Sequence, residues 1–185
     1  MPDPRPPALT ERSRRTVRRG AKFDFEVVTL AARSGHTLER ECVRHPGAVV
    51  ILPLLGDPPE ARLVLVRNHR FTLGRRLLEL PAGTIEPPES PEETARRETL
   101  EETGYLPATI TPLTRFHTSP GMSDETMWAF VARGLTQAVA DAQDDEDLEP
   151  VILPASEALR AARAGELEDA KTILTLLLAS DLGLI

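Results

Sequence analysis

The pattern of apolar and polar positions divides the chain near residue 46. Residues 23–27 read Phe-Asp-Phe-Glu-Val, the strict alternation of a half-buried strand. A Ser-Gly turn at 34–35 and a second strand-like run over 38–43 predict a returning strand. Residues 1–45 are therefore expected to form an N-terminal tail and a small antiparallel β unit. The tail is the arginine-rich stretch over residues 5–22, which is expected to be partly disordered and to lead into the first strand.

From residue 47 the pattern changes to continuous apolar runs, AVVILPLL at 48–55 and RLVLV at 62–66. Such runs are typical of strands covered on both faces. Further strands are predicted at 77–80, 110–116, 127–135 and near residue 151, with two closing helices. The mixed order of strands and helices predicts that residues 46–185 form one α/β/α layered domain.

The boundaries of the central helix are marked by residues with known capping preferences. Ser90 is a favourable N-cap, Pro91 suits the first helical position, and Glu93 completes a capping box with Ser90. Gly104 supplies the left-handed residue that often follows a last turn. The sequence therefore predicts a helix between Ser90 and Gly104.

Three glutamates of this helix, Glu98, Glu101 and Glu102, share one face because residues three and four apart are neighbours. Two carboxylates about 5 Å apart repel by roughly 3 kcal/mol at an effective dielectric of 20, and less in water and salt. Arg97 can reach Glu93 or Glu101, which leaves surplus negative charge near Glu98 and Glu102. Either the face is a solvated acidic surface with intrahelical ion pairs, or it holds a divalent cation. Hard oxygen ligands favour magnesium.

These glutamates belong to a longer motif of fixed spacing: a glycine, five residues, a glutamate, seven residues, then Arg-Glu-x-x-Glu-Glu-x-Gly. Its members are Gly83, Glu89, Arg97, Glu98, Glu101, Glu102 and Gly104. The motif resembles the signature of the Nudix hydrolases, with Thr99 standing where that family usually has an aliphatic residue. The resemblance implies a Nudix-type α/β/α sandwich with a mixed sheet. It also implies a Mg²⁺ site, with Mn²⁺ as the alternative ion.

By the same resemblance, Glu98 and Glu102 ligate the metal and Glu101 assists. The backbone carbonyl of Ala82 is a further ligand, and Glu89 and Arg97 brace the loop and the helix. All of these roles are implied by the family resemblance.

Three further segments, at 79–83, 119–125 and 165–172, resemble the ADP-ribose pyrophosphatase branch of the family, as does the strand end at 67–70. The resemblance implies that Arg70 pairs with a substrate phosphate, although a surface ion pair is the alternative, and that Glu79 lies near the substrate entrance. A loop bearing Ser119, Gly121 and Met122 would cover the adenosine-ribose side.

A catalytic base is expected in the acidic loop at 144–147, because related enzymes take a glutamate from a late acidic loop. Glu146 is the first candidate and Asp145 the second. The alternative is a merely solvated loop.

The predicted function is magnesium-dependent hydrolysis of ADP-ribose, or a similar ADP-sugar, to AMP and a sugar phosphate. The alternatives are hydrolysis of another nucleoside diphosphate sugar such as GDP-mannose, and a module that senses a nucleotide sugar without hydrolysing it. Because the chain retains every carboxylate of the motif, the sequence favours an enzyme.

Composition restricts the partners and the compartment. The formal net charge is −7 and the only lysines are Lys22 and Lys171, which argues against broad nucleic-acid binding.

The longest apolar runs are too short for a membrane span, and no apolar core follows the N-terminal arginines as a secretory signal requires. The single cysteine, Cys42, fits a reducing cytoplasm. Exposed edges of the N-terminal β unit suggest a homodimer through the N-terminal strands.

Overall fold

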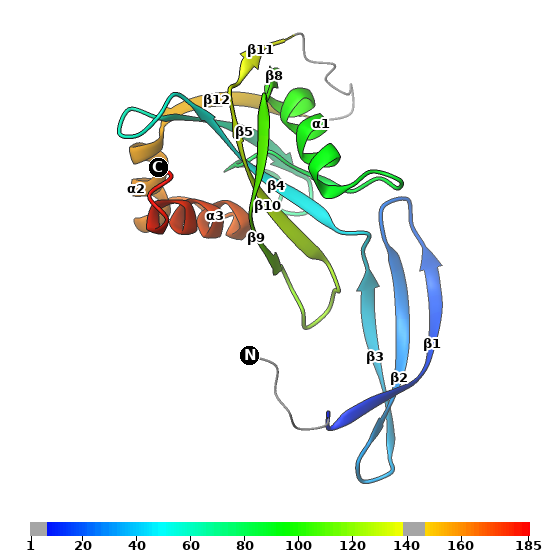
Figure 1. The fold of residues 1–185 in the computed structure, drawn as a ribbon. Helices are drawn as coiled ribbons and strands as arrows, with labels where there is room; N and C mark the ends of the chain where they lie inside the picture. The colour runs from blue at the N-terminus through cyan, green and yellow to red at the C-terminus, as the bar shows by residue number, and fades with distance from the viewer. Residues whose placement is uncertain (1–6, 139–146) are drawn as a thin grey trace.

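The computed structural model describes residues 7–138 and 147–185 and contains a large mixed sheet between helices, with a separate three-stranded sheet beside it (Figure 1). The large sheet has the order β12-β5-β4-β10-β9, and β6 and β7 pair with β5 and β4. β4 (Ala48–Leu55) runs parallel to β10 (Thr126–Arg133), whereas the other recorded pairings in this sheet are antiparallel. The remaining strands of this sheet are β5 (Arg62–Arg70), β6 (Arg75–Glu79), β7 (Ala82–Thr84), β9 (Thr109–His117) and β12 (Leu148–Pro154). Two short strands, β8 (Tyr105–Leu106) and β11 (Thr136–Gln137), pair with each other.

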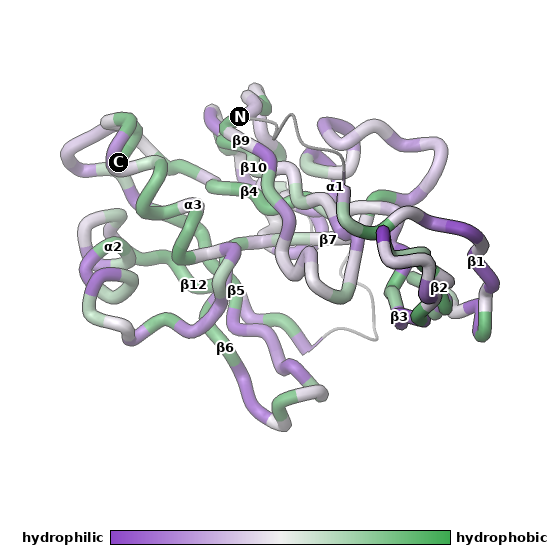
Figure 2. The backbone as a smooth tube through the Cα atoms, turned by 90° about the horizontal axis from the view of Figure 1, so that it is seen from below, coloured by the Kyte–Doolittle hydropathy of each residue, from purple (hydrophilic) through white to green (hydrophobic). Residues whose placement is uncertain are grey.

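Helices cover both faces of the large sheet. Residues of β4 alternate between the two layers. Val50 and Leu52 belong to the core cluster that includes Leu176 of α3 (Ala170–Asp181) and residues of α2 (Ala155–Arg163). Val49 belongs to the other cluster with Ala95 of α1 (Pro91–Thr103). Figure 2 shows the apolar colouring concentrated along α3 and the inner strands. The prediction of an α/β/α layered domain preceded by an antiparallel β unit is confirmed.

The N-terminal sheet has the order β1-β2-β3, with β2 (Asp24–Ala32) and β3 (Thr37–Arg44) close to their predicted positions. The prediction of a tail over residues 5–22 is wrong for β1 (Leu9–Arg19), which pairs antiparallel with β2. Every residue of β1 is exposed. The strand is held by main-chain pairing with β2 and by ion pairs such as Arg14 with Glu26, at 2.6 Å. Because it buries no side chain, its sequence shows no alternation of apolar and polar residues.

The N-terminal sheet is fastened to the loop that connects β9 and β10. The Val43 amide donates to the Met122 carbonyl at 2.8 Å, and the Asp124 amide donates to the Val43 carbonyl at 3.3 Å. Asp124 accepts from the His45 amide at 2.9 Å and pairs with the Arg44 guanidinium. These contacts place one end of the N-terminal sheet against the large sheet of the same chain.

The central helix α1 has the boundaries that the sequence predicts. The Ser90 hydroxyl accepts from the Glu93 amide, the Glu93 carboxylate accepts from the Ser90 amide at 2.7 Å, and Pro91 begins the helix. Gly104 ends it with φ of 74°. None of the helices in the described part of the chain is long and apolar enough to cross a membrane.

Candidate active site

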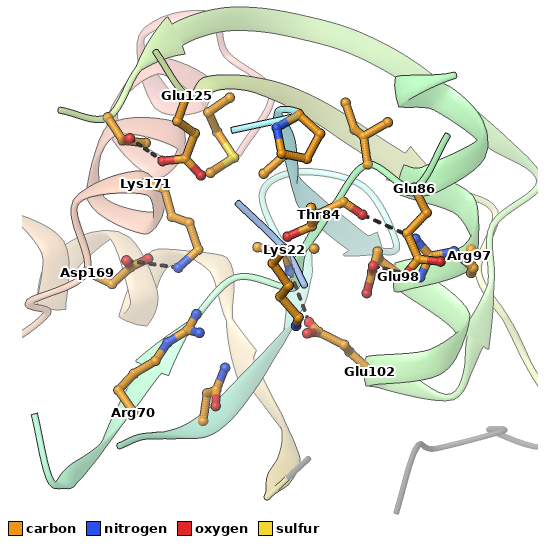
Figure 3. Close-up of a pocket in the computed structure, with 18 of the residues that line it drawn as sticks. Lys22, Arg70, Thr84, Glu86, Arg97, Glu98, Glu102, Glu125, Asp169 and Lys171 are labelled. Carbon is orange, nitrogen blue, oxygen red and sulfur yellow. Dashed lines mark hydrogen bonds and ion pairs between the residues drawn. The ribbon is translucent and has the colours of Figure 1, made fainter. Parts of the chain in front are cut away.

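A cavity of about 620 Å³ lies among the ends of β5 and β7, the loop before α1, the start of α3 and the turn between β1 and β2 (Figure 3). This volume suits a ligand of nucleotide size. Its walls carry five carboxylates and four cations: Glu86, Glu98, Glu102, Glu125 and Asp169, and Lys22, Arg70, Arg97 and Lys171.

One wall of the cavity carries Glu98 and Glu102 of α1, which are 8% and 7% exposed. The Glu102 carboxylate accepts a hydrogen bond from the Ala82 amide at 3.0 Å. Gly83 leaves room for Glu98, because a Cβ at Gly83 would lie 1.9 Å from Glu98 Oε1. The first glycine of the motif therefore allows β7 to pass directly against a carboxylate of α1.

Arg97 joins this helix to the preceding loop. Its guanidinium donates to both Glu89 oxygens, at 2.9 and 3.0 Å, and to Glu98 and Glu101 at 2.7 and 2.9 Å. The hydrogen bonds that Arg97 donates to Glu89 lower the pKa of Glu89 and raise the pKa of Arg97. The predicted reach of Arg97 to Glu101 is present. Glu93 is instead taken up by the helix cap.

The donor atoms on this wall suit a divalent cation. Glu98 and Glu102 are hard oxygen donors on one pocket wall, and Ala82 lines the same pocket. Glu101 is absent from the lining, and one Arg97 nitrogen bridges Glu98 and Glu101. Across residues 7–138 and 147–185, no three His, Cys, Asp or Glu side chains are arranged as a ready-made metal cluster. Glu98 and Glu102 are therefore two side chains on this wall that could hold an ion.

The opposite wall is built on Glu79, which is 1% exposed. Its carboxylate accepts from Arg70 at 2.8 and 2.5 Å and from Lys171 at 2.5 Å, and Lys171 also pairs with Asp169 at 2.9 Å. Burial alone would raise the pKa of Glu79, but the hydrogen bonds and charges of Arg70 and Lys171 outweigh burial and lower it. Glu79 thus lies behind the two cations, which themselves line the cavity.

Glu79→Gln is expected to lower the free energy of unfolding by about 3 kcal/mol at pH 7, because it removes the charge that compensates the buried Lys171 ammonium. A carboxyl whose pKa is lowered by folding stabilises the fold above its ordinary pKa of 4.5, and this stabilisation is lost as pH falls below it. The difference between wild type and variant should therefore shrink in acid. Urea unfolding from pH 3 to 7 measures it.

Glu166→Gln is the matched control, since Glu166 pairs with Arg160 on an exposed surface and such pairs contribute little. Equal stability of wild type and Glu79→Gln at pH 7 would contradict the structural role of Glu79.

The remaining predicted residues lie near the cavity, outside it, or outside the described chain. Ser119, Gly121 and Met122 belong to the loop between β9 and β10 but do not line the cavity, and Met122 is 59% exposed. The same loop contributes Thr118 and Glu125, which are hydrogen-bonded to each other. Glu146 and Asp145 lie outside the described residues.

Several lining residues received no role from the sequence: Lys22, Asn68, Glu125, Asp169 and Lys171. For two of them the composition offered a signal, because the chain has only two lysines, Lys22 and Lys171, and both line this cavity. Lys22 received no role from the sequence because it lies in the stretch that was predicted to be a tail.

The chain is similar in sequence and in fold to known proteins. A model of the NUDIX domain matches residues 44–176. The chain is 37% identical over 155 residues to an ADP-ribose pyrophosphatase of Bacillus subtilis (strain 168), covering 83% of this chain and 82% of that protein. It is also 37% identical over 157 residues to a methanol dehydrogenase activator of Bacillus methanolicus, covering 84% and 83%. A crystal structure of an ADP compounds hydrolase superposes with a TM-score of 0.80 at 25% identity, covering 95% of this chain and 94% of the other.

Proposed function

Since this chain belongs to the Nudix family of hydrolases, we propose that it hydrolyses the diphosphate linkage of ADP-ribose, or of a similar ADP-sugar, to AMP and a sugar phosphate. The observation that carries the proposal is the arrangement of the cavity, in which Glu98 and Glu102 share a cavity of nucleotide size with Arg70 and Lys171. A metal-bound diphosphate needs carboxylates that hold the metal ion and positively charged side chains that hold the phosphates. The similarity to an ADP-ribose pyrophosphatase supports the choice of nucleotide sugar.

The proposed cofactor is Mg²⁺, with Mn²⁺ as the alternative, held by Glu98 and Glu102 with the Ala82 carbonyl. When bound, the ion neutralises negative charge on the diphosphate. Arg70 and Lys171 orient the phosphates, for which a guanidinium fork and an ammonium point charge are suited. Glu89 and Arg97 join the preceding loop to α1, and Glu101 contributes through its hydrogen bond with Arg97.

The chain must also accept a proton from the attacking water. Glu146 is the proposed general base and Asp145 the second candidate, as the family resemblance implies. The residue that follows Glu146, Asp147, pairs with Arg76 of β6. Ser119, Gly121 and Met122 are proposed to cover the adenosine-ribose side of the substrate.

The compartment and the oligomeric state of the enzyme are proposed from its sequence and its fold. A single cysteine favours the reducing cytoplasm. The N-terminal unit proposed for residues 1–45 contains the three-stranded sheet β1 to β3, in which β1 is a fully exposed edge strand, and such edges favour pairing with another chain. We therefore propose a homodimer through this sheet, with a nucleotide sugar rather than nucleic acid or membrane as the ligand.

A panel of nucleotide sugars tests the function directly. With Mg²⁺, ADP-ribose is expected to be cleaved to AMP and ribose phosphate, identified by chromatography and mass spectrometry, and excess EDTA is expected to abolish turnover. Because the cavity walls recognise the diphosphate, GDP-mannose serves as the competitor in the same assay. Cleavage of GDP-mannose but not ADP-ribose would reassign the substrate, and tight binding of ADP-ribose without turnover in Mg²⁺ or Mn²⁺ would indicate a sensor.

A further inference from the structure

The turn between β1 and β2 brings the N-terminal sheet into the cavity of its own chain. We propose that Lys22, at this turn, binds a phosphate group of the substrate, so that the sheet contributes to the active site in addition to any role in dimerisation. The inference rests on the proposed function, since it assigns a further residue to the same substrate. Lys22 and its neighbour Ala21 both line the cavity, and Figure 3 shows the Lys22 side chain extending into it on the side of Glu102.

The turn is closed by hydrogen bonds that hold Lys22 in place. The Gly20 amide donates to the Phe23 carbonyl at 3.1 Å and to the Asp24 carboxylate at 3.2 Å. A Cβ at Gly20 would lie 2.3 Å from the Phe23 carbonyl oxygen. The close approach that a glycine permits therefore makes a compact turn with Lys22 at its tip.

The attachment of the sheet explains why Lys22 reaches the cavity of the same chain. β3 is bonded to the loop between β9 and β10 through Val43 and Asp124, and that loop supplies Thr118 and Glu125 to the cavity wall. The contacts that fasten the sheet are thus adjacent to the site, and they set the position of the β1–β2 turn over it.

The charges of the cavity give Lys22 a distinct role. Arg97 is bonded to three glutamates, Arg70 to Glu79, and Lys171 to Glu79 and Asp169. Among the cations that line the cavity in the described part of the chain, Lys22 is the one for which no hydrogen bond or ion pair is recorded. A diphosphate entering this cavity meets five carboxylates, and an ammonium that has no partner among residues 7–138 and 147–185 is suited to its charge.

Direct binding separates this role from a purely catalytic effect. The probe is an ADP-ribose analogue with a methylene bridge between the phosphates, which cannot be hydrolysed there, titrated by calorimetry with Mg²⁺ and again with EDTA. Lys22→Met is expected to weaken binding about tenfold to hundredfold in both conditions, the usual loss for a charged hydrogen bond. With ADP-ribose as substrate, KM should rise by a similar factor while kcat changes less than about threefold.

Two further variants serve as controls. Lys22→Arg keeps the positive charge and should recover most of the lost affinity. Arg19→Met removes a neighbouring charge at the exposed end of β1 that does not line the cavity, and it should leave binding within about twofold of wild type. Circular dichroism and thermal unfolding establish that each variant is folded.

The outcomes distinguish the two proposals. If wild type hydrolyses ADP-ribose and Lys22→Met binds the analogue as tightly as wild type, the inference about Lys22 is wrong and the proposed function stands. An affinity loss for Mg²⁺ alone, with unchanged binding of the analogue in EDTA, would assign Lys22 to the carboxylates instead and also overturn the inference. If wild type neither binds the analogue nor hydrolyses ADP-ribose, the proposed function itself fails.

Discussion

Glu98→Gln is expected to lower kcat for ADP-ribose about a thousandfold, equivalent to about 4 kcal/mol of transition-state stabilisation. The amide has almost the shape of the carboxylate but lacks its charge, so the proposed cation would lose an anionic ligand. Glu98 is buried against Gly83 and hydrogen-bonded to Arg97, so its carboxylate is held at a defined position on the wall. The measurement is kcat at saturating ADP-ribose over a magnesium titration, accompanied by thermal unfolding.

Two other substitutions on α1 make this result specific. Glu102→Gln should cause a loss of the same order, because Glu102 lines the same wall. Glu92→Gln removes an exposed carboxylate from the first turn of the same helix and should leave kcat unchanged. If folded Glu98→Gln and Glu102→Gln retained full activity, the metal assignment would be refuted, and the solvated acidic helix neutralised by arginine would be the better description.

Gly83→Ala is expected to lower kcat at least a hundredfold while changing the melting temperature by only a few degrees. The added Cβ would fall 1.9 Å from Glu98 Oε1 and 2.0 Å from its Cδ, so the carboxylate has to move away. The clash is with the end of a flexible side chain, and Gly83 does not have a positive φ, so alanine can be accommodated by the backbone. Misplacing a catalytic group by about 1 Å can cost a hundredfold in rate. Parallel measurements of kcat and thermal unfolding separate loss of activity from loss of the fold.

The double variant Gly83→Ala/Glu98→Gln tests whether the alanine acts through Glu98. The effects of two substitutions that act through the same interaction are not additive. The kcat of the double variant should therefore be no lower than the kcat of the less active single variant. Multiplication of the two losses would show that Gly83 affects the reaction independently of Glu98.

The sequence was sufficient to predict those helices and strands whose stabilising interactions leave a pattern in their own residues. The limits of α1 follow from Ser90, Pro91 and Gly104, whose preferences arise from hydrogen bonds and backbone angles at the helix ends. β4 and β5 were recognisable because burial on both faces requires unbroken apolar residues. The motif spacing also identified Glu98 and Glu102, since helical periodicity places them on one face.

The pairing of β1 and the contacts of Glu79 with Arg70 and Lys171 could not be predicted in this way. β1 is stabilised by pairing with β2, so its exposed side chains carry no periodic signal. Glu79 and Lys171 are 92 residues apart, and nothing in either local sequence indicates that a buried carboxylate will hold that lysine. The reach of Lys22 depends on how β3 is fastened to a distant loop, which is a property of the assembled sheets.

The amino-acid sequence alone determined the family resemblance, the layered α/β/α class and the acidic face of α1, because these depend on spacing and on periodic burial. Only the tertiary structure decided which cations face those carboxylates, that Arg97 is shared among three glutamates, and that Lys22 enters the cavity. The physical reason is that charge pairing in a cavity depends on distances between segments remote in the chain, and these distances are set by packing of the sheets and helices rather than by any local preference.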